Sequence, residues 1–363
     1  MADSPLRILI TGACGVTPRA IARSLRISRR LRDATLIGTD RGGNWYGFYE
    51  GLYDRVYLVP GAGDPRYPDA IAAICAQEAI DAAVVSPESE VLFWSEREFP
   101  VPTLLPSRGV VRVAISKKSL YDALAGSGLT PRHSTVTRDQ LLARSGLELA
   151  EGPVWLRDFS DTSSSGNGSI RVTDAEQAYA WAYLNPRITE YMVAEYLPGR
   201  NFACCLAFDR DELVKVGCYE RLEYFMGRLV VSGISGNISR GRLVDEAAVR
   251  AVAEEAVRRI SARVQEPAHG LFTVDLREAG DGVPKVTEIN VRHTAATSAL
   301  AEGGANMTEA QVLTALGRRD EIGEVVTTLP QERVILRDID GPPLLVAERA
   351  LQLGEFIERR SDT

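Results

Sequence analysis

The chain has 363 residues, which is more than one hydrophobic core usually holds, so two or three domains are expected. The charged fraction of 25% and the apolar fraction of 45% are those of an ordinary globular protein, and the net charge of −7 argues against the basic face that nucleic-acid binding needs. We expect small-molecule partners, with no nucleic acid and no membrane.

The five cysteines are an odd number without a Cys-x-x-Cys pair, and no histidine follows them at metal-ligand spacing. They are therefore expected to be reduced thiols. No run approaches the eighteen apolar residues of a membrane span, and no apolar signal stretch precedes the first strand. A cytoplasmic location is the expectation.

The first third of the chain alternates short apolar strands with helices. The expected strands are residues 6–10, 34–40, 54–60, 81–87 and 101–106, and the expected helices begin at Pro18 and at residue 69. Such alternation predicts a parallel sheet with helices on both faces, which is a doubly wound, Rossmann-like α/β domain over residues 1–113.

The first strand, turn and helix, Ile8 to Ala22, partly match a dinucleotide-binding fingerprint. Gly12 and Gly15 fit its glycine positions, but Pro18 replaces the third small residue and, with Thr17 as the N-cap, is expected to be the first helical residue. Asp40, at the end of the second strand, could hold a ribose hydroxyl. An NAD(P)-dependent oxidoreductase is therefore one alternative, and a purely structural turn is the other.

After residue 113 the regular alternation stops. Helices are expected over 119–129, 174–184 and 245–264, and strands over 151–159, 191–197 and 202–209. This mixture predicts an α+β region over residues 114–330. Residues 331–363 are expected to hold a hairpin over 332–346 and a polar C-terminal helix.

A hairpin over residues 271–292 carries the strongest chemical signal. If residues 281–282, Asp-Gly, form a two-residue type I′ turn, Asp275 lies directly opposite Glu288. Like charges opposite each other destabilise a hairpin by up to ~1 kcal/mol, so a compensating partner is expected.

Strand alternation places Asn290 and Arg292 on the face that carries the two carboxylates. Carboxylate and carboxamide oxygens are the hard ligands that Mg²⁺ prefers, and Mg²⁺ would keep positions for water and phosphate. Arg292 would neutralise a phosphate or a developing anion beside the metal. A solvent-exposed polar strand face with a fortuitous register is the alternative.

A loop dense in serine and glycine follows the apolar strand that contains Arg157. Small residues let backbone N–H groups approach phosphate oxygens. The candidates are Ser163, Ser164, Ser165, Gly166, Asn167, Gly168 and Ser169. A flexible linker is the alternative, although a linker between two strands of one domain would be unusual.

Together these segments resemble the ATP-grasp ligases, in the branch of the carboxylate-amine ligases and the synthetase halves of carbamoyl-phosphate synthetase. The resemblance covers nearly the whole chain. It implies an ATP-grasp module over 114–330, divided into a central and lid part, 114–200, and a C-terminal part, 201–330. In this family the N-terminal domain binds no dinucleotide, so Gly12 and Gly15 would build a turn beside the acceptor substrate's pocket.

The resemblance also implies roles for the site residues. Asp275, Glu288 and Asn290 would bind Mg²⁺ or Mn²⁺, and Met192 to Glu195 would form the hinge that binds adenine. The expected catalytic residues are Arg292, Lys117 and Arg157. The expected ATP-binding residues are Lys117, Arg157, Ser163, Ser164, Ser165, Gly166, Gly168, Glu195, Tyr196, Leu197 and Asn201.

Two positions depart from the family pattern. Asn201 stands where a glutamate commonly binds the ribose, so that contact would be weaker or supplied by another group. Arg157 replaces the more frequent lysine, as it does in the carbamoyl-phosphate synthetase branch. Neither departure removes a metal ligand, so the resemblance implies an active enzyme.

The implied activity is an ATP-dependent carboxylate-amine ligase. It would phosphorylate a substrate carboxylate to an acyl phosphate and couple this to an amine, with release of ADP and phosphate. Amino acids or small peptides are the expected substrates and a homodimer the expected assembly. Residues 163–169 and 230–241 are expected to close over the site.

Three alternatives stay open. A bicarbonate-activating, carbamoyl-phosphate-like kinase would use the same residues, and the NAD(P)-dependent oxidoreductase would use the N-terminal glycines instead. His293, next to Arg292, is either a structural histidine or a general base for the amine.

Overall fold

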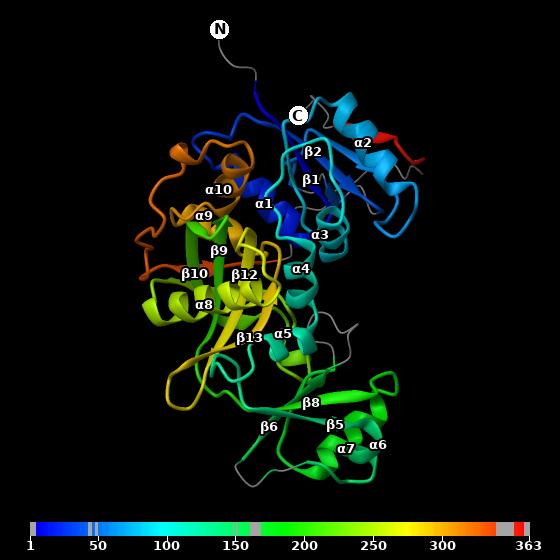
Figure 1. Ribbon diagram of the computed structural model, residues 1–363, viewed down its shortest axis with the longest axis vertical. Coiled ribbons are helices and arrows are strands. Elements are labelled where there is room, and N and C mark those ends of the chain that lie inside the picture. Colours follow the sequence, from blue (N-terminus) through cyan, green and yellow to red (C-terminus); the bar gives the residue numbers. More distant parts are fainter. Residues whose placement is uncertain are drawn as a thin grey trace.

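The computed structural model describes residues 5–42, 46–47, 50–147, 149, 152–159, 168–338 and 352–358. Three sheets with flanking helices follow one another along the long axis of the molecule (Figure 1). The mixed α/β content agrees with the sequence prediction. Among the described residues, no helix is both long enough and apolar enough to cross a bilayer.

The N-terminal sheet has five strands in the order β15-β3-β2-β1-β4. Its strands are β1 (Arg7–Thr11), β2 (Thr35–Asp40), β3 (Arg55–Leu58), β4 (Ala82–Val84) and β15 (Phe356–Glu358). The first four are parallel, and β15 pairs antiparallel with β3.

Helices cover both faces of this sheet. The helices of this part are α1 (Val16–Arg26), α2 (Tyr67–Gln77) and α3 (Glu88–Ser95). Because successive strand residues point to opposite faces, Leu9 packs in the same cluster as α2 and α3. Ile8 and Ile10 pack with α1 and with α10 (Met307–Ala315).

Two predictions for this part are wrong. Residues 101–106 form no strand, because Pro102 and Pro106 lack the N–H groups that a ladder needs; the carbonyl of Pro102 accepts only from Ala83 N (2.9 Å). The polar C-terminal helix is replaced at Phe356–Glu358 by β15. There the ring of Phe356 packs on Tyr57, with 5.0 Å between centroids.

The middle sheet has six strands in the order β13-β12-β9-β10-β11-β14. Its strands are β9 (Asn201–Asp209), β10 (Glu212–Tyr224), β11 (Ile238–Val244), β12 (Gly270–Glu278), β13 (Pro284–Asn290) and β14 (Val334–Leu336). β14, the only described strand of the expected 332–346 hairpin, pairs with β11; residues 339–351 lie outside the described part.

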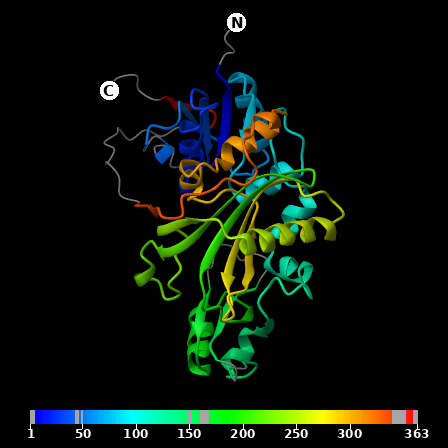
Figure 2. The ribbon, with the colours of Figure 1, turned by 90° about the vertical axis from the view of Figure 1, so that its left-hand side faces the viewer.

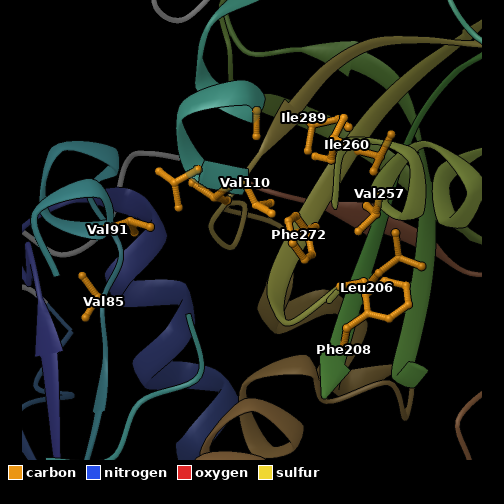
Figure 3. Close-up of a cluster of buried hydrophobic side chains, with 14 of the residues drawn as sticks. Val85, Val91, Val110, Leu206, Phe208, Val257, Ile260, Phe272 and Ile289 are labelled. Carbon is orange, nitrogen blue, oxygen red and sulfur yellow. The ribbon is translucent and has the colours of Figure 1, made fainter. Parts of the chain in front are cut away.

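Both faces of the middle sheet are covered. Phe272, Leu206 and Phe208 pack against α8 (Ala247–Arg263) on one face. The same cluster continues through α4 (Arg108–Ile115) to Val85 and Val91 of the N-terminal domain (Figure 3). On the other face, Leu300 of α9 (Thr297–Glu302) and Met307 of α10 pack together in a second cluster.

The third sheet, at the bottom of Figure 1, has four antiparallel strands in the order β5-β8-β6-β7. Its elements are β5 (His133–Thr137), β6 (Val154–Asp158), β7 (Ile170–Val172), β8 (Glu190–Glu195), α6 (Arg138–Leu142) and α7 (Ala175–Leu184). Helix α5 (Lys117–Ala123) precedes it and ends before Gly126 and Gly128, whose φ values are +72° and +73°.

Candidate active site

The β12–β13 hairpin brings Asp275 and Glu288 directly opposite each other, as the sequence predicts. The predicted turn is wrong, however. Glu278 pairs with Pro284, and the Ala279 N–H donates to the carbonyl of Val283 (2.9 Å), so the loop has three residues and not two. Such loops need a left-handed residue, and Gly282 has a φ of +80°.

A β-bulge restores the predicted pairing. Leu276 pairs with Val286 and Asp275 with Glu288, so Thr287 is the extra residue between them. The loop has one residue more than predicted, and β13 has one extra residue at the bulge. The two shifts in register cancel, so Asp275 still lies opposite Glu288. The bulge also exposes a carbonyl, since Thr287 O accepts a hydrogen bond from Nη1 of Arg157 (3.1 Å).

Arg157 also binds the carboxylate of Glu288. Its Nη2 donates to Oε2 of Glu288 (3.2 Å), while its own backbone belongs to β6 of the four-stranded sheet. Arg157 thus joins the hairpin to the sheet that also carries the predicted hinge. Lys117, at the start of α5, is buried near the same pair of residues.

Asp275 is held by an arginine that the sequence reasoning missed. Nη2 of Arg221, on β10, donates to Oδ1 of Asp275 (2.5 Å). Nη1 of Arg221 donates to Oδ1 of Asn201 (3.1 Å) and to the carbonyl of Phe202 (3.0 Å). β10 also carries Glu212, Lys215, Glu220 and Glu223, so no pattern in its sequence singles out Arg221.

The pKa values of Asp275 and Glu288 are shifted in opposite directions. Burial raises the pKa of Asp275 above its ordinary value, and the neighbouring Arg221 opposes this only in part. Burial also acts to raise the pKa of Glu288, but the charges of Arg157, Lys117 and Arg292 together hold that pKa below its usual range. At neutral pH Glu288 is therefore the firmly ionised member of the pair.

The remaining oxygens of this cluster fit a hard divalent cation. In the described part of the chain, Oδ2 of Asp275, Oε1 of Glu288 and the carboxamide of Asn290 accept or donate no hydrogen bond. No group of three or more His, Cys, Asp or Glu side chains is placed for a metal in those residues, so water and phosphate would complete the coordination.

Arg292 and His293 follow β13 directly. Nε of Arg292 lies 3.2 Å from Oε1 of Glu88, the first residue of α3, so this arginine links the hairpin to the N-terminal domain. His293 is 1% exposed, and its ring nitrogens contact Thr297 Oγ1 (2.9 Å) and Gln311 Oε1 (2.8 Å). His293 is therefore the structural histidine and not a base facing substrate.

A cavity of about 640 Å³ joins these residues to all three sheets. Its lining contains Asp275, Glu288, Asn290 and Arg292, and five of the eleven predicted ATP-binding residues: Arg157, Glu195, Tyr196, Leu197 and Asn201. Residues 234–238, part of the segment expected to close over the site, line it too. Lys117 and Gly168 are not among the lining residues, and Ser163, Ser164, Ser165, Gly166 and Asn167 lie outside the described residues.

The predicted hinge forms an apolar wall of the cavity with a polar end. Met192, Ala194 and Trp155 supply the apolar surface. The carboxylate of Glu195 is bonded by Nε of Arg132 (2.9 Å). Such a wall suits a flat heteroaromatic ring with hydrogen-bonding edges.

Asn201 is committed to protein contacts. Besides accepting from Arg221, its Nδ2 donates to the hydroxyl of Tyr224 (2.9 Å). It lies directly opposite Arg277 in the β9–β12 ladder, so its surroundings are basic. These contacts give it the role of orienting Arg221, which in turn holds Asp275.

The N-terminal glycine loop is a structural turn. The N–H groups of Ala13, Cys14 and Gly15 donate to Thr39 O (2.9 Å), Asp40 Oδ2 (3.1 Å) and Gly12 O (2.9 Å). Three consecutive amides that would face a pyrophosphate are thus already satisfied within the protein. Asp40 caps this loop, which argues against the dinucleotide alternative.

Comparison with known proteins agrees with this geometry at the level of the fold. No protein-family model matches the sequence, and no curated protein matches it in sequence. Among solved structures, an L-amino acid ligase from Bacillus licheniformis superposes with a TM-score of 0.62 and 14% identity, over 87% of this chain and 77% of that one.

Two nucleotide complexes are also similar. N5-carboxyaminoimidazole synthetase from Staphylococcus aureus, complexed with ADP, has a TM-score of 0.57 and 12% identity, over 85% of this chain and 77% of that one. A biotin carboxylase complex with β,γ-ATP from Campylobacter jejuni has a TM-score of 0.60 and 14% identity, over 91% of this chain and 73% of that one. At sequence identities this low, the structural similarity shows only the fold, which is the ATP-grasp fold.

Proposed function

We propose that this chain, which has the ATP-grasp fold, is an ATP-dependent ligase that joins a carboxylic acid to an amine. The observation that carries the proposal is the facing pair Asp275 and Glu288, each with one oxygen held by an arginine and one left for a ligand. Oxygen ligands of this kind beside buried basic residues suit a magnesium-bound triphosphate.

The protein's part in phosphoryl transfer is to position the nucleotide and to neutralise charge. The wall formed by Met192 and Ala194 holds the adenine, and Arg157 holds phosphate oxygens. Lys117, buried near Arg157 and outside the cavity lining, adds positive charge beside the phosphates. Mg²⁺ or Mn²⁺, when bound by Asp275, Glu288 and Asn290, would neutralise the β and γ phosphates.

The reaction then follows two steps. A carboxylate oxygen of the first substrate attacks the γ phosphorus, the bond to the β-phosphate oxygen breaks, and ADP leaves. The amine of the second substrate attacks the acyl phosphate carbon and loses a proton as inorganic phosphate departs, which leaves an amide. Arg292, fixed by Glu88, stabilises the negative charge on the oxygen of the tetrahedral species.

The solved ligase that resembles this chain acts on L-amino acids by its name, which makes amino acids or small peptides the first substrates to test. The decisive experiment is a screen for ADP release with ATP, Mg²⁺ and amino acids in pairs. ADP is expected only when both an acid and an amine are present, with a product mass lower than their sum by one water.

Two other outcomes identify the alternatives. Release of ADP that depends on bicarbonate, without an acid, would indicate a carbamoyl-phosphate-like kinase. A melting temperature raised by NAD(P) and unaffected by ATP with Mg²⁺ would instead indicate an oxidoreductase and would overturn the ligase proposal.

A further inference from the structure

Arg277 lines the cavity beside the predicted hinge. It lies on β12, two residues after Asp275, and pairs with Asn201 at the start of β9. The carbonyl of the next residue, Glu278, accepts a hydrogen bond from the N–H of Gly199 (3.1 Å), so β12 is bonded here to the chain that leaves the hinge. In Figure 2 the yellow β12–β13 hairpin extends from the middle sheet toward the green four-stranded sheet that carries the hinge.

Three basic residues gather at this place. The guanidinium carbons of Arg277 and Arg171 lie over the ring of Tyr196, 5.7 Å and 4.9 Å from its centroid. Lys285 lies directly opposite Arg277 in the β12–β13 ladder, and its Nζ donates to the carbonyl of Gly128 (2.6 Å). Like charges directly opposite each other destabilise a hairpin, so a negative partner is expected.

The described residues supply no such partner. No carboxylate among them forms an ion pair with any of the three cations, and Nε of Arg277 is buried without a hydrogen-bond partner. The carboxylate of Glu195, which adjoins Tyr196 in the sequence, is bonded by Nε of Arg132 (2.9 Å). That of Glu278 accepts from the backbone N–H of Arg200 (3.1 Å). An anionic group on a bound ligand would therefore meet three basic side chains and no competing carboxylate.

Arg277 lies between the two ends of the proposed nucleotide site. Asp275, on the same face of β12, belongs to the phosphate end, and Tyr196 directly follows the hinge that would hold the base. The ribose joins the base to the phosphates, so it is the part of the nucleotide nearest Arg277. Asn201, where the family commonly has a ribose-binding glutamate, already has both ends of its carboxamide bonded within the protein.

We propose that Arg277 supplies the ribose contact and makes the site accept a nucleotide whose ribose carries a phosphate at its 2′ or 3′ oxygen. The inference rests on the proposed function, which places the nucleotide in this cavity, and names the nucleotide class. A glutamate beside the ribose would repel such a phosphate, whereas the planar guanidinium of Arg277 can donate to two of its oxygens and Lys285 adds positive charge. Arg277 acts in recognition and not in the chemical step.

Calorimetric titration of the full chain tests this subsite without turnover. The probes are AMP, adenosine 2′,5′-bisphosphate and adenosine 3′,5′-bisphosphate, each with and without saturating AMPPNP and Mg²⁺. We expect one bisphosphate to bind at least about 10-fold more tightly than AMP, as a charge-assisted hydrogen bond would give, and AMPPNP to displace it. The tighter of the two identifies which oxygen carries the phosphate. Equal binding of all three probes, or a bisphosphate that AMPPNP does not displace, would overturn the proposal.

Variants assign the preference to the arginine. Arg277→Gln should bring the affinities for AMP and the bisphosphate to within about 2-fold of each other, Arg277→Lys should keep part of the preference, and Arg277→Glu should reverse it. Arg263→Gln removes the same charge from an exposed position in the last turn of α8, outside the cavity lining, and should leave the preference unchanged. A preference that survives Arg277→Gln, in a protein folded by circular dichroism, would contradict the assignment.

Turnover separates this inference from the ligase function. For a substrate pair found by ADP release, Arg277→Gln should raise the KM of the nucleotide and leave the KM values of the acid and the amine within about 2-fold. Bisphosphate binding that depends on Arg277, without ADP release from any pair, would retain the subsite and remove the ligase. ADP release by a wild-type protein that binds AMP and both bisphosphates equally would retain the ligase and remove the subsite.

Discussion

Asp275 and Glu288 face each other across the β12–β13 ladder, yet their pKa values are shifted in opposite directions. The difference comes from their surroundings. Burial and the charge of Glu288 raise the pKa of Asp275 against the charges of Arg221 and Arg292. Glu288 is bonded by Arg157, and the charges of Lys117 and Arg292 also lower its pKa. A divalent cation between the two would remove the remaining repulsion, because it favours the ionised form of both.

The first prediction concerns Glu288→Gln. Loss of one charged metal ligand should lower kcat/KM for ADP release by at least about 100-fold, because the metal supplies several kcal/mol of charge stabilisation. Asp281→Asn, in the loop of the same hairpin, is the control and should keep full activity. Turnover by Glu288→Gln at the wild-type rate would contradict the metal assignment.

The second prediction concerns Arg221→Met. This change leaves the buried Asp275 without its partner and should lower the free energy of unfolding by roughly 3–5 kcal/mol at pH 8. Without Arg221 the pKa of folded Asp275 rises further, so the folded state binds a proton that the unfolded chain has released. Stability should therefore fall as pH rises above the ordinary Asp range, and the loss should be smaller at pH 5.

Urea unfolding at pH 5 and pH 8 measures this effect. The double variant Arg221→Met with Asp275→Asn should recover most of the lost stability, because no buried charge remains. A loss of equal size at both pH values, not relieved by Asp275→Asn, would show that Arg221 stabilises the fold through packing.

The pairing of Asp275 with Glu288 was predictable because hairpin register depends on local sequence, even though the loop and the bulge were not. The loop with Gly282 and the bulge at Thr287 each add a residue, and the two errors cancel at the site. The bulge itself depends on Arg157, 130 residues earlier in the chain, which bonds its carbonyl. Such distant partners leave no trace in the hairpin's own sequence.

Arg221 was missed for a related reason. β10, which carries Arg221, is covered on both faces and therefore lacks the alternation that reveals a half-buried strand. The turn at the N-terminal glycines, in contrast, was predicted from the sequence. The argument against a dinucleotide comes only from the folded loop, where the backbone N–H groups are already hydrogen-bonded within the protein.

The third prediction tests the glycine loop as a structural turn. Gly12 has a φ of +66°, and a Cβ there would lie 2.5 Å from Cγ of Pro87. Gly12→Ala should therefore lower the free energy of unfolding by about 1–3 kcal/mol through left-handed strain and overpacking. Gly63→Ala, where nothing lies within 4 Å of the added Cβ, should change it by less than about 0.5 kcal/mol. Equal urea midpoints for the two variants would contradict the tight approach of Pro87.

The fourth prediction concerns the pH dependence of stability at His293. Burial lowers the pKa of His293 to about 4, and the hydrogen bond that His293 Nε2 donates to Gln311 Oε1 opposes this only in part. An unfolded histidine has a pKa near 6.5, so between these values the unfolded chain binds a proton that the folded chain does not. Stability therefore rises with pH in this window and is lost as pH falls through it, by about 3 kcal/mol in all.

Urea unfolding of wild type and His293→Gln at pH 7.5, 5.5 and 4.5 isolates this contribution, because the other titrating groups are common to both proteins. Glutamine keeps polar atoms near Thr297 and Gln311 but cannot take up a proton. The stability difference between the two proteins should favour wild type at pH 7.5 and shrink by about 2–3 kcal/mol at pH 4.5. A difference that stays constant over this range would mean that His293 titrates normally in the folded protein, and that its buried contacts with helices α9 and α10 do not form as described.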